Sequence, residues 1–137
     1  KRDLVVEELK KHLSIAQQAF RTLQESLNAP YSPIVRDSCL LRFTYTFDVC
    51  WKLLNKFLDV HLGLICNSPK TCIREAFKNG LFNEQEAERW LLMVDDRNQI
   101  AYSYVEAIAE AIYHRLPSFA EAVDSFLNDM HKHLEEA

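Results

Sequence analysis

Glycine and proline are scarce in this sequence, which has 2 glycines and 4 prolines among its 137 residues. Gly63 and Gly80 are too few and too far apart for a G-x-G-x-x-G or G-x-x-x-x-G-K-[ST] loop, so a phosphate-cradling glycine loop is excluded. Turn-rich all-β folds also need more glycine than this. The composition, with 48% hydrophobic residues, therefore favours a packed all-α protein.

A basic excess is also missing, because the net charge is −4 and the pI is near 5.7. This argues against a general affinity for nucleic acid, DNA included. The four cysteines at positions 39, 50, 66 and 72 contain no C-x-x-C pair and fit no zinc framework, so we expect free thiols, no disulfide and no metal site. No apolar run approaches the ~18 residues of a membrane span. With no recognisable signal peptide, we expect a reduced, cytoplasmic protein.

Apolar residues recur at helical spacing along most of the chain. A first helix is predicted up to Leu27, because its stripe repeats every three or four residues from Leu9 onward. Asn28, Pro30 and Pro33 break it, and a second helix is predicted from about Ile34 to His61, ending at Gly63. The main stripe of this second helix is Leu40, Phe43, Phe47, Cys50/Trp51, Leu54 and Phe57/Leu58.

Three further helical segments follow. Ser68-Pro69 begins a short helix that includes residues 71–79, and Asn83 caps a longer one that runs to about Ala101. The stripe from Val105 to Leu134 keeps its phase across Pro117, which predicts either a kink or two helices on one axis. We therefore predict a single helical domain over residues 1–137, built as an up-down-up-down four-helix bundle with one additional short helix.

The second helix carries another apolar row formed by Leu41, Tyr45 and Val49, roughly opposite its main stripe. A helix with two apolar faces is usually buried on both. We expect this row to contact a second subunit in a homodimer. The alternative is that the row packs under the short extra helix.

Arg97 is the most informative polar residue, because it continues the apolar stripe of Trp90, Val94 and Ala101. Arg36, at the start of the second helix, likewise lies on the side of its helix that carries the apolar stripe. Arginine is rarely buried without a partner. The two arginines therefore indicate either structural ion pairs, with partners among aspartates 37, 48, 95 and 96, or a polar cleft for an anion. Spacing alone favours the ion pairs.

No pattern of catalytic residues accompanies them. The histidines are scattered, and serines 38 and 103 and the cysteines lack a suitably spaced histidine for nucleophilic catalysis. Asp95 and Asp96 are adjacent on a helix, so their side chains diverge, and we interpret them as solvated surface. The glycine-serine turn and spaced aspartates of a nucleotidyltransferase active site are absent from the sequence.

Several stretches together resemble a known family, the substrate-binding subunits of minimal nucleotidyltransferases, which form a HepT-like branch of the HEPN superfamily. The resemblance covers roughly residues 30–127. The stretches are Arg36-Asp37-Ser38, Leu41 to Asp48, Trp51-Lys52, Ser68-Pro69-Lys70, Arg74 to Phe77, Gly80-Leu81-Phe82, Trp90, and Asp95-Asp96-Arg97-Asn98 with Tyr102-Ser103-Tyr104.

The resemblance implies a helical bundle that dimerises and pairs with a separate minimal nucleotidyltransferase, which carries the catalytic aspartates. Magnesium and nucleoside triphosphate are then expected in the partner, and no cofactor in this chain. This chain is expected to bind the substrate without being an enzyme on its own. The implied substrate-binding residues are Arg97, Asn98, Tyr102 and Tyr104, with Arg36 and Arg42 contributing from the second helix, and a nucleotide or other phosphate-bearing ligand fits them.

Related members are RNase toxins whose signature is Arg, four residues, His, one residue, Tyr, and a nucleotidyltransferase antitoxin silences them. The alternative function is such a toxin with an altered motif. In this sequence Tyr102 occupies the histidine position, and a tyrosine that titrates near pH 10 is a poor general base. Thr44 also occupies a position where the resemblance suggests an acid, which removes a possible partner for Arg97.

Overall fold

The computed structural model describes residues 2–135, and every regular element among them is a helix. The four long helices are α1 (Arg2–Leu27), α2 (Pro33–Leu62), α4 (Glu84–Gln99) and α5 (Glu106–Glu135). A short helix, α3 (Pro69–Lys78), joins α2 to α4. A 3-10 turn, η1 (Ile100–Tyr102), follows α4. The predicted helical bundle with a short additional helix is confirmed.

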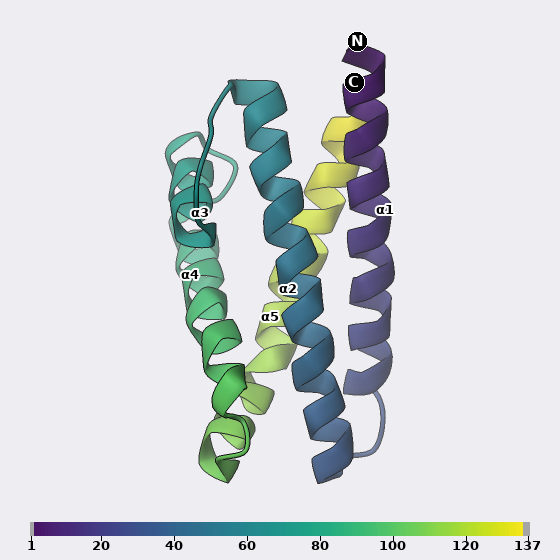
Figure 1. Cartoon of the computed structure of the whole chain (residues 1–137), viewed down its shortest axis with the longest axis vertical. Coiled ribbons are helices and arrows are strands. Elements are labelled where there is room, and N and C mark those ends of the chain that lie inside the picture. The colour runs from purple at the N-terminus through teal and green to yellow at the C-terminus, as the bar shows by residue number, and fades with distance from the viewer. Residues whose placement is uncertain (1, 136–137) are drawn as a thin grey trace.

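The long helices alternate in direction, so that the start of α1 and the end of α5 lie at the same end of the bundle (Figure 1). The helix α2 is the central element, because it packs against α1, α3, α4 and α5. The helix α5 lies behind it and also packs against α1 and α4. The helices α3 and α4 lie side by side on the other flank of α2 from α1 (Figure 1).

The helix boundaries follow from capping residues. The Ser32 hydroxyl accepts a hydrogen bond from the Val35 N–H at the start of α2, and Ser68 does the same for Thr71 at the start of α3. Gly63 ends α2 with a positive φ of 66°, which only glycine adopts without strain. At the start of α4, Asn83 and Glu86 form a reciprocal capping box.

Two helices differ from what the apolar pattern alone indicated. The helix α1 begins at Arg2, although its buried stripe starts only at Leu9, because its first turns have exposed side chains such as Leu4. The helix α5 runs as one element through Pro117, so the alternative of two helices sharing an axis is wrong. Proline removes one backbone hydrogen bond there without ending the helix.

An aromatic cluster joins the long helices at the core. The ring of Phe43 stacks on that of Phe119 with 5.4 Å between centroids, which connects α2 to α5. Phe47 and Trp90 lie 6.0 Å apart and connect α2 to α4. Trp90 also meets Phe126 of α5 edge-on at 5.3 Å. These rings fix the position of α4, and with it the position of the arginine at its end.

The expectation of four free cysteines is wrong, because Cys66 and Cys72 form a disulfide. Cys66 lies in the α2–α3 connection and Cys72 lies in α3, with 5.3 Å between their Cα atoms. The other two cysteines, Cys39 and Cys50, are free and buried in the core. Spacing alone did not reveal the pair, because the turn at Ser68-Pro69 is what brings the two residues together.

Reducing this disulfide is expected to lower the free energy of unfolding by about 2 kcal/mol, because the crosslink restricts the unfolded chain. Urea unfolding with and without dithiothreitol measures the difference, and the Cys66→Ser/Cys72→Ser double variant serves as the control that no longer responds to reductant. Identical unfolding curves for the wild type in both conditions contradict a structural role for the bond.

None of the helices described here combines the length and the apolar character needed to cross a membrane.

Candidate functional site

Arg97 and Asp48 form a two-pronged ion pair between α4 and α2. The Arg97 Nε and Nη2 atoms donate to the two carboxylate oxygens of Asp48, each at 2.9 Å. The pair raises the pKa of the Arg97 guanidinium, since hydrogen bonds to the carboxylate favour its charged form. Thr44 occupies the position where the resemblance suggests an acidic partner for Arg97. The acidic partner in this chain is Asp48, one helical turn further along α2.

A cavity of about 270 Å³ opens beside this ion pair. Its walls come from α2, from the first residue of α3 and from the last turns of α4. The lining residues are Phe47, Asp48, Trp51, Lys52, Pro69, Val94, Arg97 and Asn98. We call this cavity the Arg97 pocket. Side chains of three helices meet here, so the pocket combines an aromatic wall with charged groups.

The Arg97 pocket keeps hydrogen-bond donors and positive charge despite the ion pair. A guanidinium has five N–H donors, and Asp48 engages only the Nε and one Nη2 hydrogen, so the Nη1 group is still available. The Arg97 side chain is 36% exposed and is therefore reachable from solvent. Lys52 adds a further positive charge, which makes the sum over Asp48, Arg97 and Lys52 positive. This combination of free N–H donors and net positive charge suits a small anion.

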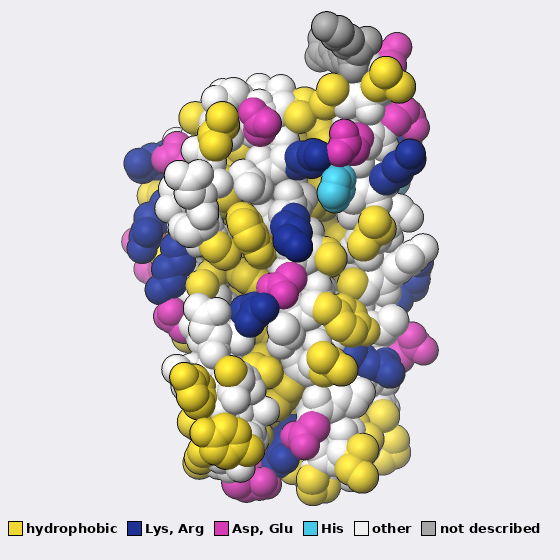
Figure 2. Space-filling view, in the orientation of Figure 1, with side chains coloured by type: hydrophobic (Ala, Val, Ile, Leu, Met, Phe, Trp, Pro, Cys, Tyr) yellow, Lys and Arg dark blue, Asp and Glu magenta, His cyan; other side chains and the backbone are white. Residues whose placement is uncertain are grey.

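The surface around the pocket is mixed in charge. Figure 2 shows Lys and Arg side chains along the middle of the face over α2, with acidic side chains between them. This fits the acidic net charge of the chain and indicates a local site, not an extended basic surface for nucleic acid.

The tyrosines of the motif lie beyond the pocket. Asn98 lines it together with Arg97, whereas Tyr102 lies in η1 and Tyr104 in the turn before α5. Both tyrosine side chains are exposed, Tyr104 at 83%. They extend from the same end of α4 as Arg97 but do not line its pocket.

Arg36 forms a separate cluster at the start of α2. Its side chain is 5% exposed, and its guanidinium donates to Glu106 at 2.6 Å, Glu110 at 2.8 Å and Asp37 at 3.0 Å. These hydrogen bonds raise its pKa, Glu110 contributing most. The hydroxyl of Tyr31 also donates to Glu110. Arg36 thus ties α2 to α5 through structural ion pairs, the interpretation that spacing favoured, although the carboxylates of Asp37 and Glu106 are largely exposed.

Arg42 and Tyr45, which belongs to the second apolar row, contact α1 instead. The Arg42 Nη1 donates to the carbonyl of Thr22 at 2.7 Å, and the hydroxyls of Tyr45 and Thr22 contact each other. Val49 is partly buried against the core, and Leu41 is 62% exposed. Of the three residues of this row, Tyr45 is the one whose hydrogen-bonding contact is with α1. Leu41 alone of the row offers a large exposed side chain to a second subunit.

The adjacent aspartates of α4 have different surroundings. Asp95 is exposed and pairs with Lys70 of α3 at 2.8 Å. Asp96 is only 4% exposed and accepts from Arg115 of α5 at 2.6 and 2.9 Å. The two side chains diverge as predicted, but the interpretation of both as solvated surface is wrong for Asp96. The Asp96–Arg115 and Arg97–Asp48 pairs together fix the last turns of α4 against two helices.

Sequence reasoning missed the roles of Trp51 and Lys52 in this pocket and named Asp48 only as one of four possible partners of the arginines. Trp51 and Lys52 were part of the family resemblance without a role attached to them. A signal was present, because Asp48 and Lys52 are four residues apart and share one side of a helix. Only the tertiary structure shows that this side of α2 faces α4. The pairing of Arg97 with Asp48, out of four candidate aspartates, required the structure.

Comparison with known proteins identifies the family of this chain. Residues 11–132 match the family described as nucleotidyltransferase substrate binding protein like. A crystal structure of a protein from Thermus thermophilus is similar, with a TM-score of 0.81 and 40% sequence identity over 84% of this chain and 98% of that one. No curated protein was found to match. The chain belongs to the nucleotidyltransferase substrate binding protein-like family.

Proposed function

We propose that this chain is the non-catalytic, substrate-binding subunit of a two-component nucleotidyltransferase in the cytoplasm. A separate minimal nucleotidyltransferase supplies the active site, the magnesium and the nucleoside triphosphate. This chain presents the acceptor for nucleotidyl transfer. The family supports the role, and the Arg97 pocket is the observation that carries the proposal.

The Arg97 pocket suits a phosphate-bearing acceptor. Lys52 supplies charge, the free edge of the Arg97 guanidinium and the Asn98 amide supply donors, and Trp51 supplies an aromatic surface. At about 270 Å³ the pocket holds a small group and not a large molecule. Asp48 acts in this proposal as a positioning residue, because it orients the guanidinium and lowers the net positive charge that a ligand meets.

A homodimer is part of the proposal, with Leu41 as the exposed contact of the Leu41, Tyr45 and Val49 row. Tyr102 and Tyr104 are exposed at the same end of the bundle and belong with the substrate-binding set. Arg36 and Arg42 act indirectly, because their guanidinium groups are engaged by Glu110 and by the Thr22 carbonyl.

Opposite changes in phosphate affinity are expected from removing a positive and a negative charge of the Arg97 pocket. Lys52→Ala and Arg97→Ala each weaken binding of inorganic phosphate at least about fivefold, which corresponds to ~1 kcal/mol. Asp48→Asn strengthens it by a similar factor, because the competing carboxylate charge is gone. Tryptophan fluorescence follows the titration, because Trp51 lines the pocket, and Lys78→Ala at the end of α3 is the matched control.

The partnership is tested by co-expression with a minimal nucleotidyltransferase. The two chains are expected to copurify, and transfer to an acceptor is expected to require both chains and to fall in Arg97→Ala. A complex whose transfer activity is unchanged by Arg97→Ala and Lys52→Ala contradicts substrate binding at this pocket. Toxicity of the chain expressed alone, abolished by Arg97→Ala, favours the RNase-toxin alternative instead.

A further inference from the structure

The Arg97 pocket is continued along α2 by a second cavity. This cavity measures about 380 Å³ and is bounded by α2, by α1 and by the connection that follows α2. Its lining residues are His12, Lys52, Asn55, Lys56, Asp59 and Ile65. Lys52 lines both this cavity and the Arg97 pocket, so the two adjoin at its side chain. We call the second one the Asp59 cavity.

The side chains that connect the two cavities follow one side of α2. They recur every three or four residues, which places them on a single side of the helix, and they are Asp48, Lys52, Asn55, Lys56 and Asp59. At a rise of about 1.5 Å per residue, Lys52 lies about 6 Å along the axis from Asp48 and about 10 Å from Asp59. Figure 2 shows charged side chains along the middle of this face, with basic and acidic ones interspersed. A ligand held in the Arg97 pocket is therefore only a short chain of atoms away from the Asp59 cavity.

The Asp59 cavity is mixed in charge. Lys56 donates to the carboxylate of Glu8 at 2.5 Å, and Asp59 supplies a second carboxylate. When Lys52 serves a phosphate in the Arg97 pocket, one lysine and two carboxylates are left here. A second phosphate is repelled by the two carboxylates, and an ammonium group is repelled by the two lysines. A neutral polar group therefore fits this cavity better than a second ion.

The polar groups of the Asp59 cavity suit hydroxyl groups. A hydroxyl both donates and accepts hydrogen bonds, so it can use a carboxylate and an ammonium group together. The Asp59 carboxylate accepts, and the Asn55 carboxamide both donates and accepts. The Lys56 ammonium has two hydrogens beyond the one that Glu8 engages. At about 380 Å³ the cavity has room for a sugar ring, which carries several hydroxyls.

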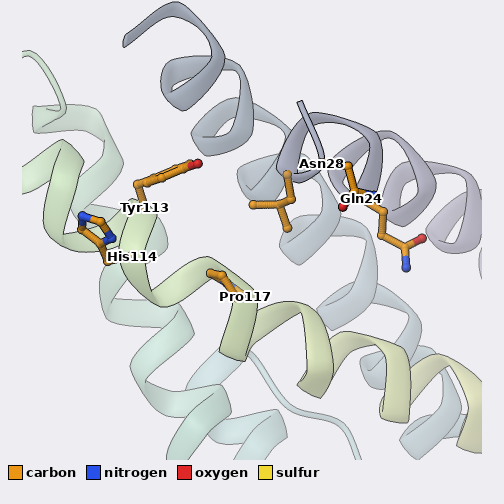
Figure 3. Close-up of a pocket in the computed structure, with 6 residues that line it drawn as sticks. Gln24, Asn28, Tyr113, His114 and Pro117 are labelled. Carbon is orange, nitrogen blue, oxygen red and sulfur yellow. The ribbon is translucent and has the colours of Figure 1, made fainter. Parts of the chain in front are cut away.

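A larger cavity elsewhere does not serve this purpose. It measures about 430 Å³ and lies between Tyr113 and Pro117 of α5 on one side and Gln24 and Asn28 on the other (Figure 3). It shares no lining residue with the Arg97 pocket, and no lysine or arginine is among the residues that line it. A ligand whose phosphate lies in the Arg97 pocket therefore extends into the Asp59 cavity instead.

We propose that the acceptor is a sugar phosphate. Its phosphate lies between Arg97 and Lys52, and its hydroxyl groups bind Asn55, Lys56 and Asp59 in the adjoining cavity. This inference rests on the proposed function and deepens it, because it names the substrate class of the same site. The sugar supplies the specificity, since inorganic phosphate fills only one of the two cavities.

Titrations with inorganic phosphate and with ribose 5-phosphate separate the two cavities. Ribose 5-phosphate is expected to bind roughly fivefold to tenfold more tightly, because its hydroxyls gain hydrogen bonds to charged groups. In ¹⁵N NMR spectra both ligands are expected to shift the amides around Arg97, and only ribose 5-phosphate those around His12 and Asp59. Pyrophosphate, which adds charge without hydroxyls, is expected to leave the amides around His12 and Asp59 unshifted.

Asp59→Ala is the decisive variant. It is expected to reduce the affinity for ribose 5-phosphate to that for inorganic phosphate, without weakening the binding of inorganic phosphate. Asp124→Ala on the exposed side of α5 is the matched control, since it removes the same charge from a residue that lines neither cavity. This control is expected to keep the preference for ribose 5-phosphate.

The failure of this inference and the failure of the proposed function give different results. Phosphate binding that depends on Arg97, combined with equal affinity for ribose 5-phosphate, overturns the sugar phosphate and leaves the proposed function standing. An unchanged preference in Asp59→Ala, or shifts around Asp59 with pyrophosphate, has the same consequence. If neither phosphate nor ribose 5-phosphate binds at several millimolar, substrate binding at the Arg97 pocket is overturned as well.

Discussion

Trp90→Ala is expected to lower the free energy of unfolding by about 3–5 kcal/mol, the range for truncating a buried aromatic residue. Trp90 is 2% exposed and lies within 6.0 Å, centroid to centroid, of Phe47 and Phe126. It also stacks on Phe82, in the connection between α3 and α4, at 5.7 Å. Its removal therefore loosens α4 from three neighbouring segments at once. Urea unfolding followed by circular dichroism measures the loss, and a loss below about 1 kcal/mol contradicts this packing role.

The same substitution is expected to weaken phosphate binding, because Trp90 positions the helix that carries Arg97. Trp90→Phe is the matched control, since it keeps an aromatic ring and is expected to retain most of the stability and the binding. Trp90→Phe also leaves Trp51 as the one tryptophan of the chain, which makes its fluorescence a direct report on the Arg97 pocket. Full phosphate affinity in a folded Trp90→Ala variant contradicts the link between packing and the site.

Arg36→Ala is expected to cost on the order of 2 kcal/mol, the range for losing charge-assisted hydrogen bonds. The guanidinium is almost fully buried, whereas its partners Asp37 and Glu106 are largely exposed, which limits the loss. The substitution deprives three neighbouring carboxylates of the Arg36 charge. Arg36→Lys is the conservative control, since one ammonium group cannot reach all three carboxylates in the same geometry and is expected to rescue only part of the loss. Wild-type stability in Arg36→Ala contradicts the role of the cluster.

The pH dependence of stability provides a second measurement on this cluster. The hydrogen bonds from Tyr31 and then Arg36 hold the pKa of Glu110 below its ordinary value of 4.5. Since the folded state has the lower pKa, this contribution is fully present above pH 4.5 and is lost as the pH falls through the folded pKa. Unfolding midpoints below pH 4.5 are therefore expected to fall less steeply in Arg36→Ala than in the wild type. Parallel profiles contradict the assignment.

Local features of the sequence determined the helices and their ends. The three-and-four spacing of apolar residues predicts each long helix, because a helix must bury one stripe of its surface, and the caps at Ser32, Ser68 and Asn83 satisfy free N–H groups within their own first turns. The continuity of α5 through Pro117 was harder to predict. Packing on α1 and α4 compensates for one missing hydrogen bond, and that compensation depends on other helices.

The sequence by itself determined an all-helical bundle, the family, and Arg97 as a polar residue on an apolar stripe, since these depend on residue order and spacing. Only the tertiary structure decided that Asp48 pairs with Arg97, that Asp96 is buried against Arg115, and that Cys66 meets Cys72. The physical reason is that a charge or a thiol selects its partner by distance and direction. Those are fixed only when the helices have packed.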